Sequence, residues 1–309
     1  MSRKTEKALH AFHKFMAEKA PQGAKDGEEL QRLIQEFFAA YNETLANGAD
    51  GTDEMDMYDY LELADQSSSK HKKKQYLEQA AALAPDNMDV KLAQLEVDTK
   101  SPLDFVAALP ELIETERNRL KREQLYTNNR GDFWMVFETR PYMRLLQRYM
   151  MALMDCGIFI KAIEVGETMM GLNKNDNLGI RYTLMVLYAK TSDETKALKL
   201  YHINAGEADC PSYLLPLSLL YFKLGKWDTA KSYLMKLKET CPGTKKFIRA
   251  VKKGDIETLL RTMYSPGGYT IGTAEELVDM YLDHQLAYEA ELFFFEWADE
   301  ALIVHRKKK

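Results

Sequence analysis

Cysteine is scarce in this 309-residue sequence, which contains only Cys156, Cys210 and Cys241 at wide spacing. An odd number of widely spaced cysteines does not fit a disulfide framework, so we expect reduced thiols. Clusters with metal-ligand spacing are also lacking, because His10 and His13 supply two ligands without a partner carboxylate. The sequence therefore predicts neither a bound metal nor a cofactor.

Long apolar runs are absent as well. No stretch approaches the roughly 20 apolar residues that a membrane-spanning helix needs, and polar residues 1–7 are not followed by the apolar core of a signal peptide. We therefore expect a cytoplasmic protein without a membrane partner.

Positive charge is in deficit, since 42 Lys and Arg against 47 Asp and Glu leave a formal net charge of -5. Nucleic-acid binding needs clustered cations, so nucleic acid is not the expected partner. Two signatures of catalysis, a phosphate-binding glycine loop and a nucleophile elbow, are missing too. We predict that the chain is not an enzyme.

A short pattern recurs in the middle of the chain. An alanine follows a small residue by five positions in three pairs, Gly157 and Ala162, Ser192 and Ala197, and Gly225 and Ala230. The alanines lie 35 and 33 residues apart, which is the period of stacked tetratricopeptide helix pairs. This period predicts an all-α fold, a right-handed α-solenoid of antiparallel helix pairs that forms a tetratricopeptide-like superhelix.

The helical spacing of apolar residues indicates two domains. Helices over Arg3–Lys19 and Gly27–Ala46 predict an N-terminal helical hairpin in residues 1–50. The stretch Ala46–Thr52 is rich in Gly, Asn and Asp and predicts a linker. The solenoid is then expected over residues 51–309.

Two parts of that solenoid depart from the repeat. A long helix and an aromatic loop form an insert near residues 102–138, and Pro110 is expected to kink or break the helix. The loop, residues 126–138, is either buried or a binding element. A capping helix pair is predicted over residues 273–302, with its second helix at Tyr288–Leu302, and its dense aromatic residues offer a route to a homodimer.

Three segments carry a family resemblance: the run Glu138–Arg144, the helix pair around Gly157, and the run Leu172–Tyr182. Together they resemble a family of tetratricopeptide-like proteins that is widespread in bacteria and similar to the suppressor of tumorigenicity 7 group of animals. The sequence departs from that family at Lys174, where proline is usual. The resemblance implies a scaffold, in a family whose function is largely unassigned.

The register of the repeats predicts which side chains face the concave groove. These positions are Gln147, Met151, Met154, Tyr182, Val186, Leu215, Leu219 and Phe222, with Arg144 and Arg148 at one end. Such a groove is mostly apolar and suits a helix or strand of a partner, or the N-terminal hairpin of the same chain. We therefore expect a scaffold that binds a protein or peptide segment there. The alternative is a nucleic-acid-associated or regulatory module in which phosphates are met by Arg144, Arg148, Arg181 and Lys70–Lys74. Arg140, four residues before Arg144, is a further candidate to bind a carboxylate or phosphate.

Overall fold

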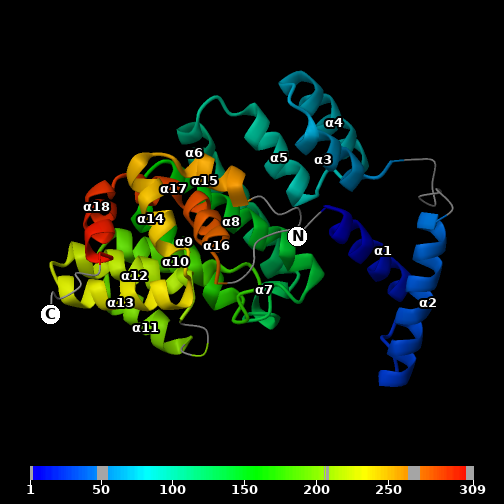
Figure 1. The fold of residues 1–309 in the computed structure, drawn as a ribbon. Helices are drawn as coiled ribbons and strands as arrows, with labels where there is room; N and C mark the ends of the chain where they lie inside the picture. Colours follow the sequence, from blue (N-terminus) through cyan, green and yellow to red (C-terminus); the bar gives the residue numbers. More distant parts are fainter. Residues whose placement is uncertain (1–2, 47–54, 205, 207–208, 264–271, 304–309) are drawn as a thin grey trace, which may run out of the picture. The chain divides into compact units, whose positions relative to one another are not determined.

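The computed structural model describes residues 3–46, 55–204, 206, 209–263 and 272–303 (Figure 1). In these residues every regular element is a helix, which confirms the predicted all-α class. The chain divides into two compact units, Met1–Phe105 and Val106–Lys309. The domain boundary predicted at residues 50 and 51 lies outside the described residues.

The first unit contains five complete helices. They are α1 (Arg3–Lys19), α2 (Gly27–Ala46), α3 (Met57–Gln66), α4 (Lys70–Leu83) and α5 (Met88–Asp98). The first two occupy the ranges that the apolar spacing predicts. Phe12 of α1 packs against Phe37 of α2 with ring centroids 5.1 Å apart, and Lys7 of α1 pairs with Asp59 of α3 at 3.0 Å. Leu61, Leu77 and their neighbours form a small core between α3, α4 and α5.

The remaining helices start with α6, which begins just before the boundary between the units. They are α6 (Pro102–Arg122), α7 (Leu125–Asn128), the 3-10 turn η1 (Phe137–Thr139), α8 (Arg140–Asp155), α9 (Phe159–Leu172), α10 (Ile180–Lys190), α11 (Glu194–Ile203), α12 (Pro211–Lys223), α13 (Trp227–Thr240), α14 (Thr244–Lys253), α15 (Ile256–Met263), α16 (Ala274–Asp283), α17 (Gln285–Glu289) and α18 (Leu292–Ala301). Among the helices in the described ranges, none is both long and apolar enough to cross a membrane.

In three helix pairs, α8–α9, α10–α11 and α12–α13, the turn between the two helices of the pair has the same geometry. Gly157, Ser192 and Gly225 all adopt left-handed backbone, with φ of 72°, 60° and 70°. After each of them, the next amide donates to the carbonyl five residues earlier, as Ile158 does to Leu153 at 2.8 Å. This bond closes the first helix of each pair, because it satisfies a carbonyl that the helix end leaves unpaired.

A fourth turn of the same kind joins α14 and α15. Gly254 has φ of 67°, and the amide of Asp255 donates to the carbonyl of Ala250 at 2.9 Å. The sequence period missed this turn, since Leu259 stands where the other three pairs carry a fully buried alanine.

The expected break at Pro110 does not occur, because α6 runs through this residue. A proline inside a helix costs about 3 kcal/mol through its missing amide and its clash with the preceding turn. Leu109 and Leu120 on the same helix are fully buried, and burying one leucine contributes roughly 1.5–3 kcal/mol. Packing therefore offsets the local cost.

The aromatic loop folds against the start of α8 and the end of α9. Phe133 and Trp134 are buried, and the amide of Gly131 donates to the carbonyl of Leu172 at 2.9 Å. The guanidinium of Arg140 donates to the carbonyl of Trp134 at 2.7 Å. Of the two alternatives for this loop, the structure shows a buried insert for these aromatic residues.

The C-terminal segment contains three helices where two were predicted. The expected helix Tyr288–Leu302 corresponds to α18, which begins only at Leu292, and α17 occupies the predicted connection before it. Between α17 and α18 lies a turn in which the amide of Glu291 donates to the carbonyl of Tyr288 at 2.9 Å. The Glu291 carboxylate also pairs with Lys190 at 3.0 Å and Lys223 at 3.3 Å. The turn therefore places the Glu291 carboxylate against α10 and α12, where it forms both ion pairs.

Candidate functional site

The face predicted to be the concave groove is partly covered by the C-terminal helices. Helix α16 packs on α12, α17 packs on α8 and α10, and α18 packs on α13. The ring of Phe222 on α12 lies 5.6 Å from that of Phe294 and 5.2 Å from that of Trp297. The residues that contact this face are therefore C-terminal ones of the same chain.

The ten predicted contact residues fall into two groups. Met154, Val186, Leu215 and Leu219 are buried in the chain's own interior. The other six are half-buried: Arg144, Gln147, Arg148, Met151, Tyr182 and Phe222. A partner role for the buried four stays a prediction, and in this structure their side chains are covered.

Three of the half-buried residues line an open cavity of about 700 Å³, which we call the groove cavity. Gln147 and Met151 come from α8, and Tyr182 comes from α10. Helix α16 forms another part of the lining, which we call the acidic wall, with the carboxylates of Glu276, Asp279 and Asp283. The sequence reasoning missed this acidic wall, because α16 lies about 90 residues beyond α10 and only tertiary packing brings the two together.

The acidic wall holds its charges in different ways. The carboxylate of Glu276 is buried and accepts a hydrogen bond from the amide of Gly272 at 2.6 Å. Asp279 is exposed. Desolvation and the neighbouring Asp279 carboxylate raise the pKa of Asp283, although His284 opposes the shift. A cation bound beside Asp279 and Asp283 would stabilise their charged forms.

His284 joins the acidic wall to α10. Its Nδ1 lies 2.9 Å from the carbonyl of Met280 and its Nε2 lies 3.1 Å from Oγ1 of Thr183. Because a carbonyl only accepts, Nδ1 carries the proton and Nε2 accepts from the threonine hydroxyl. Desolvation lowers the pKa of His284 despite opposing contributions from Met280 and Asp283.

Acid is expected to weaken the fold through His284. The pKa of His284 in the folded protein lies below the ordinary value of 6.5. Its contribution to the free energy of unfolding is therefore complete above pH 6.5. This contribution is lost as the pH falls from 6.5 toward the folded pKa, with a slope of at most about 1.4 kcal/mol per pH unit. Urea unfolding between pH 7.5 and 5.5 measures the slope. His284→Gln should give a flatter profile, and an identical slope in both proteins would refute this assignment.

The arginines of the alternative phosphate-binding face are engaged by the chain itself. Arg140 stacks on Trp134, with its guanidinium carbon 5.5 Å from the ring centroid. Arg181 pairs with the buried carboxylate of Asp176 at 3.1 Å. Arg144 and Arg148 are half-buried and also take part in interactions. These side chains are therefore not a freely exposed cationic row.

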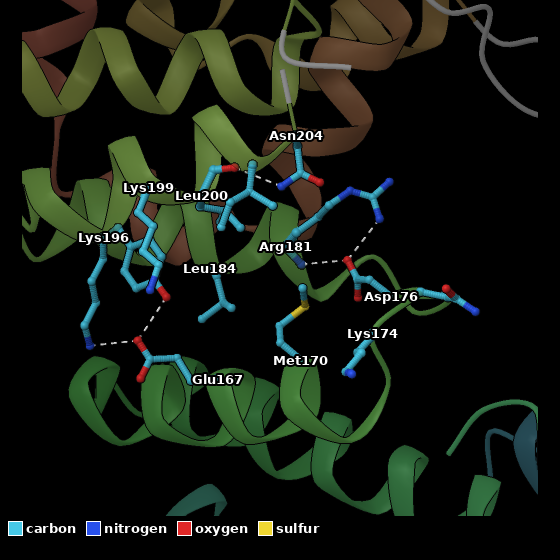
Figure 2. A pocket seen from close by; sticks show the side chains of 13 residues that line it. Glu167, Met170, Lys174, Asp176, Arg181, Leu184, Lys196, Lys199, Leu200 and Asn204 are labelled. Atoms are coloured by element: carbon cyan, nitrogen blue, oxygen red, sulfur yellow. Dashed lines mark hydrogen bonds and ion pairs between the residues drawn. The ribbon is translucent and has the colours of Figure 1, made fainter. Parts of the chain in front are cut away.

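A second cavity of about 650 Å³ lies between α9, α10 and α11, and we call it the lysine cavity (Figure 2). Its basic lining residues are Lys174, Arg181, Lys196 and Lys199. Glu167 and Asp176 are its carboxylates. The sequence reasoning did not find it, because its cations come from separate helices and the connections between them.

The C-terminal aromatic residues that suggested a homodimer are mostly interior. Phe294 and Phe295 are fully buried, whereas Phe293 is 78% exposed. Dimerisation through this segment stays a prediction that depends on Phe293 and the neighbouring exposed Leu292.

Metal ligation finds no support in the arrangement of the described residues, where no three His, Cys, Asp or Glu side chains are grouped to hold an ion. Comparison with family models, with curated proteins and with solved structures finds no match to this chain.

Proposed function

We propose that the chain is a non-enzymatic, tetratricopeptide-like helical scaffold that binds a peptide segment in the groove cavity. Support for the solenoid part of this proposal comes from the four left-handed turns, which join four helix pairs with one hydrogen-bond pattern. A repeated turn gives each pair the same internal geometry, as expected for stacked repeats.

The observation that carries the proposal is the pair of walls around the groove cavity. Gln147, Met151 and Tyr182 were predicted as contacts from the repeat register, and all three line this cavity together with residues of α16. The volume of about 700 Å³ lies within the range of roughly 300–1,000 Å³ that is typical of ligand pockets.

The chemistry of the two walls defines the bound segment. Met151 and Tyr182 offer apolar surface, while Asp279 and Asp283 offer negative charge. A segment with a lysine or arginine beside an apolar residue satisfies both walls, because charge complementarity adds specificity to apolar burial.

Peptide display on the purified protein, followed by titration of a selected peptide, tests the proposal. Asp279→Lys should weaken binding of a basic-apolar peptide by about tenfold because it repels the basic side chain. Met151→Lys should weaken binding at least as much, because it adds the same repulsion and removes apolar contact surface. Asp228→Lys is the matched control, because Asp228 is exposed on α13 outside the cavity.

The outcomes separate the proposal from its rival. Binding that all three variants retain would place the site elsewhere and refute the proposal. Tighter binding of a single-stranded oligonucleotide than of any peptide, with a steep loss as salt rises, would favour the nucleic-acid alternative instead.

A further inference from the structure

The lysine cavity has an excess of positive charge in a chain that is negative overall. Four cationic side chains line it against two carboxylates, whereas the whole chain carries a formal charge of -5. A local excess of cations in a concavity raises the local concentration of anions, since low-dielectric walls focus the field.

Both carboxylates in the cavity are already engaged. Glu167 accepts from the hydroxyl of Tyr188 at 3.0 Å and pairs with Lys196 at 2.7 Å. Asp176 pairs with Arg181 and accepts from the amide of Ile180 at 2.7 Å. These contacts leave them little capacity to neutralise the other cations.

Lys174 and Lys199 are the two cations that remain. Both are exposed, and neither has an ion-pair partner within the described part of the chain. Figure 2 shows them on either side of Leu184, which lies in the middle of the cavity. The cavity therefore presents two separated cations, Lys174 and Lys199, with the aliphatic side chain of Leu184 between them.

We infer that the lysine cavity binds a peptide segment in which acidic residues flank an aliphatic residue. The carboxylates of the segment pair with Lys174 and Lys199, and its aliphatic side chain packs on Leu184 and Leu200. Charge-assisted hydrogen bonds from lysine to carboxylate are stronger than neutral ones and supply the selectivity for acid over amide. This site is separate from the groove cavity, although Arg181 lines both.

The lining favours a peptide over a nucleic acid. Single-stranded nucleic acids bind on aromatic faces on which their bases stack. Tyr188 is the aromatic residue of this lining, and it is buried, with its hydroxyl bonded to Glu167. Met170, Leu200 and Ile203 are aliphatic, which suits an aliphatic side chain.

Titration of defined peptides into the full-length protein tests this inference. The probe is a capped, labelled peptide of three Glu-Leu-Glu repeats, and a Gln-Leu-Gln peptide of equal length is the neutral control. Fluorescence anisotropy at low salt should show at least tenfold tighter binding of the acidic peptide. The preference should shrink as salt rises, because screening weakens exposed charges.

Charge reversal locates the site. Lys174→Glu with Lys199→Glu should weaken the acidic peptide at least tenfold, whereas Lys231→Glu with Lys246→Glu should leave it within about twofold. The control lysines are exposed on α13 and α14, outside the cavity, and change the net charge equally. Asp279→Lys in the groove cavity should not weaken this peptide, which separates the two proposals.

Three results would overturn the inference. The neutral peptide could bind as tightly as the acidic one, or both lysine double variants could lose the acidic peptide equally. In the third, a single-stranded oligonucleotide displaces the labelled acidic peptide at a lower concentration than the unlabelled acidic peptide does. Matching thermal unfolding midpoints for the two double variants confirm that both are folded in the comparison.

Discussion

Replacing Gly243 with valine is expected to lower the free energy of unfolding by about 3 kcal/mol, as overpacking of a tight contact does. Gly243 immediately precedes α14, and a Cβ atom added there meets the Cβ of Ala274 and lies 2.9 Å from the backbone nitrogen of that residue. Backbone at the start of α16 cannot rotate away as a flexible side chain can. The contact must therefore open, and α16 must shift.

Urea unfolding of Gly243→Val beside the parent protein measures this loss. Gly171→Ala is the matched control, because an added Cβ at Gly171 in α9 meets no atom within 4 Å. That variant should gain up to about 1 kcal/mol, since glycine is a poorer helix former than alanine. An unchanged unfolding midpoint for Gly243→Val would show that α16 does not sit against this glycine.

The same variant has a consequence for function. Helix α16 supplies the acidic wall of the groove cavity, so a shift of this helix separates Asp279 and Asp283 from Met151 and Tyr182. Under the proposed function, Gly243→Val should lose the basic-apolar peptide under conditions where the protein is still folded. The acidic peptide of the lysine cavity should bind as before, because α16 does not line that cavity.

Local features of the fold were predictable because they depend on residues close in the sequence. Helices α1 and α2 follow from the spacing of apolar residues over one or two turns. The turns at Gly157 and Gly225 follow from glycine's tolerance of left-handed backbone. Ser192 shows the same φ at greater conformational cost, and the repeat register, not its residue type, identified it.

Of the residues that line the groove cavity, the sequence predicted those on α8 and α10 but not those on α16. The repeat register assigns Met151 and Leu219 to one face, but an apolar side chain has the same pattern whether it meets a partner or its own chain. Leu219 is buried and Met151 lines the groove cavity. Which of them stays accessible depends on where α16 to α18 pack, and that packing joins residues too distant in sequence for periodicity to detect.

The segment before α10 shows how a local prediction gains a wider role. Side-chain oxygens of residues 173–177 are suited to capping the following helix, and Asp176 does so by accepting from the amides of Ile180 at 2.7 Å and Arg181 at 3.0 Å. Its carboxylate also pairs with the guanidinium of Arg181, while its backbone is left-handed, with φ of 46°. Aspartate tolerates this backbone better than most residues.

Asp176→Ala is therefore expected to lower the free energy of unfolding by about 3–4 kcal/mol, since it removes one partner of a buried ion pair together with two capping bonds. Asp176→Asn keeps one acceptor oxygen and the backbone preference, so it should lose about half as much. Urea unfolding at neutral pH measures both losses.

Asp193→Ala is the control, because it removes a helix cap that has a single hydrogen bond. Asp193 caps α11 through a single bond from the amide of Lys196 at 3.0 Å, and losing such a cap costs about 1 kcal/mol. If Asp176→Ala costs no more than Asp193→Ala, the ion pair with Arg181 contributes nothing to stability. A cost several times larger would show that the interactions of Asp176 with Arg181, a residue that lines both cavities, stabilise the fold well beyond a single cap.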